Sequence, residues 1–169
     1  TIMNPYYAKT LDFQEKLKEY ASNIFCTYGR ELVLNLAEYN LLHRENVDME
    51  NSNVINMALE EFLASKLEIY THCVGSEYVI DRSVRAVKDI QYDCYTIRDG
   101  VKYMFNVKAE AVQNSADDSV SSAKRKDENA FELRVKYSLR DSYKEPKSGI
   151  YHPRHIYIEQ VDVEELSLN

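Results

Sequence analysis

Apolar side chains recur at helical spacing in the first part of the chain, up to Gly75. They predict helices over residues 11–25, 30–44 and 54–70, each with one apolar stripe to bury. The positions of these stripes are, in chain order, Phe13, Leu17, Tyr20, Ile24, Leu32, Val33, Leu36, Ala37, Ile55, Leu59, Phe62, Leu63 and Leu67. Glu60 and Glu61 lie away from much of the third stripe, which predicts a solvated face for them.

After Gly75 the pattern changes from helical spacing to alternation of apolar and polar residues, which is typical of strands. Strands are predicted over residues 77–80, 84–97, 101–112, 130–139 and 155–163. Within 101–112, one face holds Val101, Tyr103, Phe105, Val107, Ala109 and Ala111, and the other holds Lys102, Met104, Asn106, Lys108 and Glu110. Strands with one apolar and one polar face suit an antiparallel sheet, because parallel strands buried on both faces are apolar throughout.

Two connections decide how these strands pair. Asp99-Gly100 stands between two alternating segments, which is a strong indication of a hairpin turn. Residues 114–129 hold little to bury besides Val120, and this composition predicts a solvated loop, with a helix as the alternative. A loop there would join the strands on either side as a second hairpin.

The predicted fold class is therefore α+β, in a single domain over residues 1–169. A curved antiparallel β-meander packs on the helix over 54–70, and together they fill residues 51–169. Residues 1–50 form a helical extension at the N-terminus.

Composition and charge limit the classes of protein. The chain is 44% hydrophobic and 29% charged, as in ordinary soluble domains, and no apolar run approaches the length of a membrane span. The first residues lack the features of a signal peptide, and three scattered cysteines do not suggest a disulfide framework. We expect an intracellular protein, cytoplasmic or nuclear, with no membrane partner. A net charge of −7 argues against a broad nucleic-acid-binding surface.

The order of helix, strand, Asp-Gly turn, strand, polar loop and strand resembles the cystatin fold. The chain looks most like the plant cystatin-like and monellin-type proteins, at Gly100, Tyr103, Phe105, Ala109, Phe131 and Val135. Inhibitory cystatins resembling it carry Gln-x-Val-x-Gly in the first hairpin, whereas residues 96–100 here are Thr-Ile-Arg-Asp-Gly, and the chain has no tryptophan for the second inhibitory loop. Charge at Arg98 and Asp99 would have to be desolvated in a protease cleft. The resemblance thus implies the scaffold without papain-type inhibition.

On this interpretation the chain is a non-enzymatic protein-binding module with no cofactor. Its partner is a protein, bound through the polar face of the sheet or through two hairpin tips. The binding residues would be Arg98, Asp99 and Gly100 at the first tip, and Lys144 and Tyr151 at the second.

The alternative is a resemblance to the PD-(D/E)xK nucleases, in which a hairpin carries an acid on one strand and an acid-x-Lys on the next. Asp93 and the segment Asn106-Val107-Lys108 have a spacing that looks right for that family. Alternation puts residues 106, 108 and 110 on one face, so a metal held at 106 would lie beside Lys108. The resemblance implies Mg²⁺ or Mn²⁺, a nucleic-acid substrate, a helix glutamate from Glu60 or Glu61, and a crossover helix within 114–129.

Asn106 departs from the nuclease pattern, because a neutral amide brings no charge to a Mg²⁺ site that usually relies on carboxylates. Three interpretations stay open: Glu110 compensates as a second metal ligand beside Asp93, the position has been altered, or the site is impaired. The catalytic set under this alternative is Asp93, Asn106, Lys108, Glu110 and Glu61.

Overall fold

A computed structural model describes residues 5–28, 31–33, 47–83, 92–112, 129–140, 143–144, 146–149, 151–152 and 155–166. Its elements along the chain are α1 (Pro5–Tyr28), β1 (Glu31–Val33), α2 (Val47–Val74), β2 (Asp81–Arg82), β3 (Cys94–Arg98), β4 (Val101–Ala111), β5 (Ala130–Arg140), β6 (Tyr143–Lys144), β7 (Tyr151–His152) and β8 (His155–Glu165). The α+β class predicted from the sequence is confirmed, and the sheet is mostly antiparallel.

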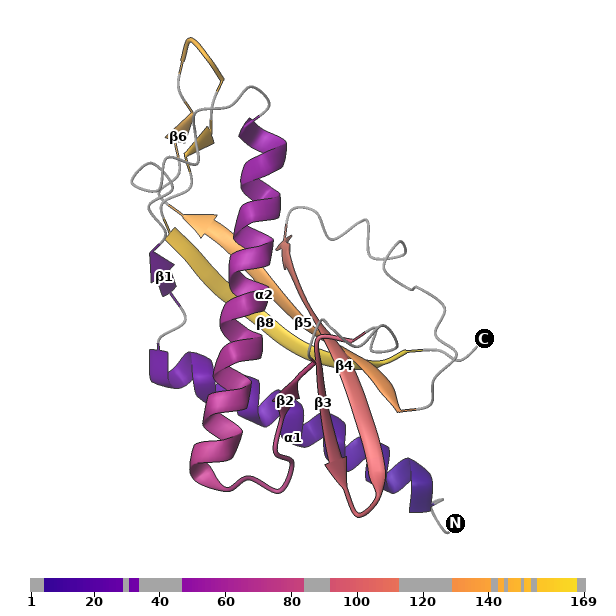
Figure 1. Ribbon diagram of the computed structural model, residues 1–169. Helices are drawn as coiled ribbons and strands as arrows, with labels where there is room; N and C mark the ends of the chain where they lie inside the picture. Colours follow the sequence, from indigo (N-terminus) through magenta and orange to yellow (C-terminus); the bar gives the residue numbers. More distant parts are fainter. Residues whose placement is uncertain are drawn as a thin grey trace.

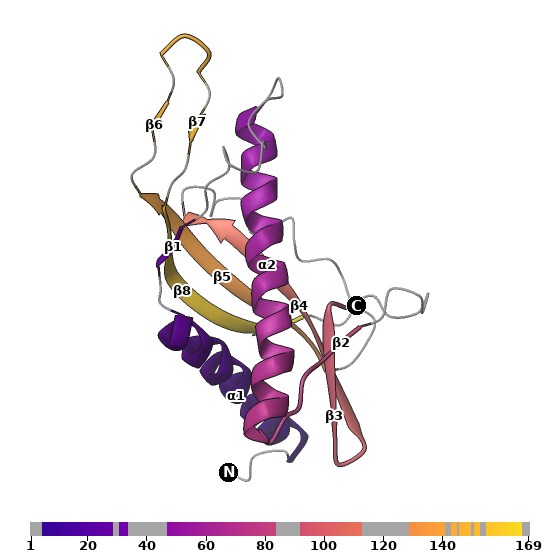
Figure 2. The ribbon, with the colours of Figure 1, turned by 60° about the vertical axis from the view of Figure 1, so that its left-hand side comes forward.

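One six-stranded sheet forms the centre of the structure, in the order β1-β8-β5-β4-β3-β2 (Figure 1). Neighbouring strands are antiparallel except β4 and β5, which are parallel from the Met104–Ala130 pair to the Ala111–Tyr137 pair. A second, two-stranded sheet joins β6 to β7 in a hairpin that projects beyond one end of the main sheet (Figure 2).

Both helices contribute to one apolar core. Phe13, Leu17 and Ile24 of α1 lie in the same buried cluster as Leu59 and Leu63 of α2. The sheet adds, from its facing positions, Tyr103, Phe105, Val107, Ala109, Phe131, Leu133, Val135, Tyr137, Ile156 and Ile158. The predicted helix over 11–25 extends to 5–28, and its buried side chains belong to this core.

The helix predicted over 54–70 extends to Val47–Val74 and ends at a glycine cap. Gly75 has a φ of +63°, a conformation that side chains other than glycine rarely adopt. The backbone N–H of Ser76 donates to the carbonyl of Thr71 at 3.1 Å, the bond that closes a Schellman motif. This cap turns the chain back toward the sheet, where β2 follows.

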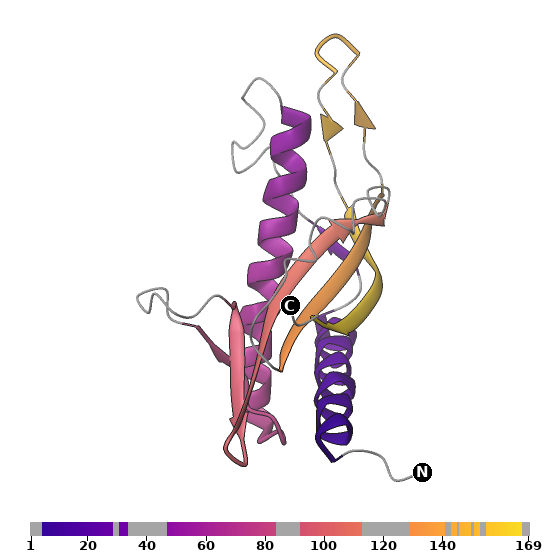
Figure 3. The same cartoon turned by 90° about the vertical axis from the view of Figure 1, so that its right-hand side faces the viewer.

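A bulge in β8 keeps its apolar residues on the core side. Register shifts where Lys136 pairs with Gln160 and Tyr137 pairs with Ile158, so that Glu159 is the extra residue. Ile156 and Ile158 before the bulge and Val161 after it are all buried, although they do not share one alternation. Figure 3 shows the strong curvature of the sheet.

Three sequence predictions need correction. Residues 31–33, expected in a helix over 30–44, form β1 and pair with β8, because sheet pairing outweighs a short apolar pattern that suits either structure. The strand expected over 77–80 is instead β2 at Asp81–Arg82. Most of the predicted loop 114–129 lies outside the described residues.

The third correction is the meander. β4 and β5 do not form a hairpin, because they run parallel and parallel neighbours need a crossover connection. One-sided strands suggested antiparallel pairing throughout, but alternation reports which face is buried and not the direction of the neighbour. This pair also departs from the all-antiparallel meander that the cystatin resemblance implies. In the described parts of the chain, neither helix is long and apolar enough to cross a membrane.

Candidate functional site

The β3–β4 hairpin brings Asp93 opposite Asn106. Asp99 and Gly100 have φ angles of 51° and 77°, as a two-residue turn with both central residues left-handed requires. Arg98 pairs with Val101 and Cys94 with Phe105 in the resulting register. One step further, the backbone N–H of Asp93 donates to Oδ1 of Asn106 at 3.0 Å.

Beyond Phe105, β4 has a free edge on the β3 side: among the described residues no strand pairs with it there. Two carboxylates accept the backbone N–H groups of this edge. Oδ2 of Asp93 accepts from Val107 at 2.9 Å, and Oε1 of Glu60, on α2, accepts from Ala109 at 3.1 Å. Glu60 and Asp93 are thereby held along one edge of β4, each with a second oxygen not used in these bonds.

Glu60 lies in an environment that disfavours its ionised form. Burial raises the pKa of Glu60 above its ordinary value and the nearby Asp93 carboxylate adds to the rise, whereas the bond from Ala109 and the charge of Lys108 lower it. Burial, followed by the Glu60 charge, also raises the pKa of Tyr137. Two acidic groups and a lysine therefore interact electrostatically at this edge.

Lys108 is the basic member of the group. It is partly exposed and makes no hydrogen bond or ion pair to another described residue. It alternates with Val107 and Ala109, whose side chains are buried in the core, so Lys108 lies on the same face of β4 as Asn106. Its ammonium is thus free to act on a bound group.

Of the two helix glutamates, Glu60 rather than Glu61 lies at this edge of β4. Glu61 forms an ion pair with Arg82 of β2 at 2.8 Å, and Arg82 also donates to Oγ of Ser65 at 2.9 Å. Glu60 lies one turn before Ala64, which is buried, whereas Glu61 is exposed.

The prediction that Glu110 joins Asp93 in a metal site is also not supported by the geometry. Glu110 is buried and forms an ion pair with Arg134 of β5 at 3.6 Å. Arg134 also lies 3.5 Å from Glu132 and 3.7 Å from Glu164. These four residues form an ionic cluster on the sheet face away from the helices. That face was predicted to be wet, yet Glu110, Glu132 and Arg134 are each less than a tenth exposed.

The raised pKa of Glu60 predicts a pH-dependent stability. The folded state binds this proton more tightly than the unfolded chain, so stability is lost as pH rises from the ordinary glutamate pKa through the raised one. Glu60→Gln keeps an acceptor for Ala109 and removes the titration. We expect the free energy of unfolding of the variant, relative to wild type, to increase as pH rises through that window. Urea unfolding at several pH values measures this, with Glu61→Gln as the matched control; a difference that stays constant or falls with pH would contradict it.

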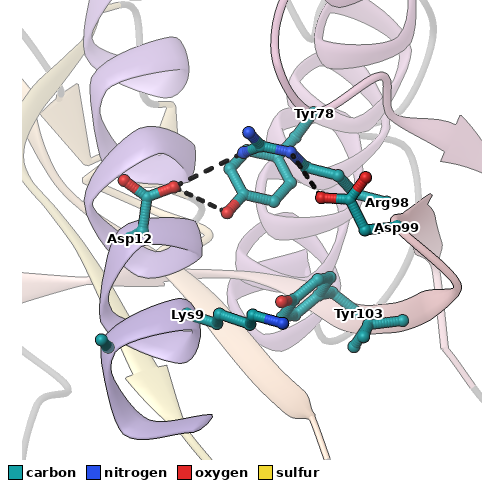
Figure 4. Close-up of a pocket in the computed structure, with 8 residues that line it drawn as sticks. Lys9, Asp12, Tyr78, Arg98, Asp99 and Tyr103 are labelled. Carbon is teal, nitrogen blue, oxygen red and sulfur yellow. Dashed lines mark hydrogen bonds and ion pairs between the residues drawn. The ribbon is translucent and has the colours of Figure 1, made fainter. Parts of the chain in front are cut away.

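A pocket of about 270 Å³ lies at the other end of the hairpin, between α1 and the Asp-Gly turn (Figure 4). Its polar groups bind one another. The Tyr78 hydroxyl donates to Asp12 at 2.7 Å, and the Arg98 guanidinium lies 4.7 Å from the centre of the Tyr78 ring. Arg98 also forms ion pairs with Asp12 at 3.6 Å and with Glu77 at 3.3 Å. The pocket therefore joins α1 to the hairpin through internal contacts.

The predicted binding residues fall at two separate places. Arg98, Asp99 and Gly100 are at the turn beside this pocket, where Arg98 makes the internal contacts just described. Lys144 and Tyr151 pair with each other in the β6–β7 hairpin, at the opposite end of the sheet (Figures 1 and 2). They do not form one surface.

Comparison with known protein families, with curated proteins and with solved structures finds no match. In the described parts of the chain, no group of three or more His, Cys, Asp and Glu side chains is placed to hold a metal ion. The edge of β4 instead combines two carboxylates with the amide of Asn106 and the ammonium of Lys108.

Proposed function

We propose that this chain is a PD-(D/E)xK nuclease-like domain that acts on nucleic acid with a divalent cation, Mg²⁺ or Mn²⁺. The observation that carries the proposal is the convergence of Glu60, Asp93, Asn106 and Lys108 where β3 begins beside β4. One acid comes from a helix and one from the residue directly before the first strand of the hairpin, and the residue-x-Lys unit comes from the second strand. This is the distribution that the nuclease resemblance implies.

The topology supports the same proposal. The chain runs from α2 through β2, β3 and β4 and then returns to β5, which lies beside β4 in parallel. Parallel neighbours require a crossover, as the nuclease resemblance implies, and the segment between Ala111 and Ala130 is long enough to supply one. An antiparallel meander would need no crossover between β4 and β5.

The donor groups of the edge suit one hard cation. Mg²⁺ is commonly bound by one or two carboxylates and keeps several waters. Glu60 and Asp93 each have one oxygen beyond the bond to the β4 backbone, and their mutual repulsion, which helps to raise the pKa of Glu60, would be relieved by a positive charge between them. Because protonation of Glu60 competes with a cation, binding should strengthen as pH rises.

The residues then have distinct roles. Glu60 and Asp93 would hold the cation, which when bound supplies Lewis-acid stabilisation of a phosphoryl oxygen. Oδ1 of Asn106 accepts a hydrogen bond from the backbone N–H of Asp93 and so holds that acid beside β4. Lys108, with no competing ion pair to a described residue, would orient the attacking water and offset the negative charge of the phosphodiester.

The protein-binding module favoured by the sequence stays a prediction. The turn at Arg98 is a poorer candidate for a partner surface than expected, because Arg98 is engaged with Asp12, Glu77 and Tyr78. Freeing it for a partner would break these contacts.

The proposal is tested by measuring metal-dependent DNA cleavage by the Lys108→Ala variant. We expect loss of metal-dependent cleavage of DNA by at least about 100-fold, the range for removing a group that handles protons in the reaction. Stability should hardly change, because Lys108 forms no hydrogen bond or ion pair to another described residue. Gel assays of plasmid and single-stranded substrates with Mn²⁺ or with EDTA measure the first, and thermal unfolding the second. Lys102→Ala is the matched control, an exposed lysine on the same strand and face.

A second arm tests the cation separately from cleavage. Mn²⁺ should raise the melting temperature of the wild-type protein, and Asp93→Asn should remove most of the rise. Asp99→Asn, an exposed aspartate of the same hairpin, should keep it. Cleavage that survives in Lys108→Ala, or a wild-type protein that neither cleaves nor gains stability from Mn²⁺, would overturn the proposal.

A further inference from the structure

Two polar groups in the pocket between α1 and the Asp-Gly turn take no part in the contacts among Asp12, Tyr78 and Arg98. Lys9 of α1 is exposed, and its ammonium makes no hydrogen bond or ion pair to another described residue. Tyr103 of β4 is only 3% exposed, yet its hydroxyl has no hydrogen-bond partner among the described residues. Both side chains reach into the pocket, and neither is joined to another residue drawn in Figure 4. Since the polar groups of buried side chains are normally hydrogen-bonded, the Tyr103 hydroxyl is placed to bind a group that enters the pocket.

Both of these groups can donate a hydrogen bond. The ammonium of Lys9 has three donors and no acceptor. Burial raises the pKa of Tyr103 above its ordinary value, against the opposing charge of Arg98, so the hydroxyl keeps its proton at neutral pH. Hydrogen bonds in which one partner is charged are the stronger ones. Two donors, one of them a cation, therefore suit an anion that offers oxygen atoms.

The charges that line the pocket favour a ligand with a single negative charge. Lys9 and Arg98 are its basic residues, and Asp12 and Asp99 are its acidic ones. Arg98 forms ion pairs with Asp12 at 3.6 Å and with Asp99 at 3.9 Å, whereas Lys9 has no counter-ion among the described residues. A phosphate dianion would meet one unpaired cation beside two carboxylates, which repel it. One carboxylate matches the charge of Lys9.

The rest of the lining is apolar and limits the size of the ligand. Ala8 and Val101 line the pocket beside the rings of Tyr78 and Tyr103, which are both almost fully buried. The volume of about 270 Å³ is close to the lower end, about 300 Å³, of pockets that bind small molecules. A short hydrocarbon chain with an acid group at one end fits these limits.

We infer that this pocket binds a small organic acid, whose carboxylate accepts hydrogen bonds from the Lys9 ammonium and the Tyr103 hydroxyl. Its hydrocarbon part would lie against Ala8 and Val101. The proposed nuclease function is not needed for this binding, because the pocket lies at the other end of the hairpin from Asp93. Failure of either one leaves the other standing.

Binding is tested with hexanoate on the full chain, by following backbone amide NMR signals in a titration at constant pH and ionic strength. Hexanol and hexylamine have the same chain length with a neutral and a positively charged head group, and inorganic phosphate supplies a dianion. We expect saturable shifts with hexanoate at residues 8–12 and 98–103. The three other probes should bind more weakly, because only hexanoate combines a single negative charge with an apolar chain.

Two variants place the carboxylate in the pocket. Lys9→Met should raise the Kd of hexanoate by about tenfold or more, and Tyr103→Phe should raise it by about three- to tenfold, the effects of losing a charged and an uncharged donor. The matched controls are Lys102→Met and Tyr95→Phe, the same changes at positions of the hairpin that do not line the pocket. Both controls should keep the wild-type Kd.

The inference fails if hexanoate causes no saturable shift, or if hexanol, hexylamine or phosphate binds as tightly as hexanoate. It also fails if Lys9→Met and Tyr103→Phe both bind hexanoate as their controls do. Loss of a hydroxyl that has no described partner should leave the melting temperature of Tyr103→Phe at the wild-type value. If that variant melts earlier, Lys9→Met decides the outcome, because the exposed Lys9 side chain can change without loss of packing.

Discussion

Replacing Phe13 by alanine is expected to lower the free energy of unfolding by about 3–5 kcal/mol, the range for removing a buried aromatic side chain. Phe13 is fully buried, and its ring contacts those of Tyr78, Tyr103, Phe105 and Phe131, with centroid distances from 4.7 to 6.2 Å. Rings on β4, on β5 and on the connection between α2 and β2 surround the cavity that the change leaves, so the site cannot easily collapse. Urea unfolding followed by circular dichroism measures the effect.

The control for Phe13→Ala is Met57→Ala on α2, since Met57 is 63% exposed and should cost well under 1 kcal/mol. A comparable small loss for Phe13→Ala would mean that α1 docks loosely on a domain that is stable without it. The expected large loss would place α1 in the folding unit that positions Glu60 and Asp93.

Helix stripes and the Asp-Gly turn were the parts of the fold that the sequence could predict. Their information is local: Phe13, Leu17 and Ile24 share a face whatever they pack against, and the turn fixes the register of its own two strands. The direction of β5 relative to β4 depends on a connection of weak pattern. β1 is a strand only because β8 is there to pair with it. Neither the direction of β5 nor the strand conformation of β1 can be predicted from the residues of that segment alone.

The site shows the same division. The hairpin register alone places Asp93 against Asn106, so this pair was within reach of the sequence. The choice of Glu60 over Glu61 depends on how α2 is rotated against β4, and Arg82 draws Glu61 to the other side. Glu110 was assigned from alternation, which gives its face correctly but not the arginine on the neighbouring strand. Side-chain partners across parallel strands can be predicted only once the strand topology is known.

Arg134→Leu is expected to destabilise the protein by about 3–5 kcal/mol at neutral pH, because it leaves buried carboxylates without their counter-ion. The Arg134 side chain is 8% exposed, and those of Glu110 and Glu132 are 10% and 6% exposed. An uncompensated charge at these positions keeps little of its hydration. The loss should shrink as pH falls, because a buried carboxyl group that lacks a counter-ion takes up a proton more readily. Urea unfolding at neutral and at mildly acidic pH measures both effects.

Two further variants show whether charge, rather than shape, is responsible. Adding Glu110→Gln and Glu132→Gln to Arg134→Leu removes the stranded charges and should recover much of the loss, since neutral replacements of a buried ion pair are often tolerated. Lys18→Ala, which breaks the exposed pair with Asp162 at 3.4 Å, should cost less than about 1 kcal/mol. If Arg134→Leu were as mild as Lys18→Ala, Glu110 would be free of its arginine at little cost, and its exclusion from the edge site would have to be reconsidered. A large loss keeps Glu110 in the ionic cluster and leaves Glu60 and Asp93 as the acids available to a cation.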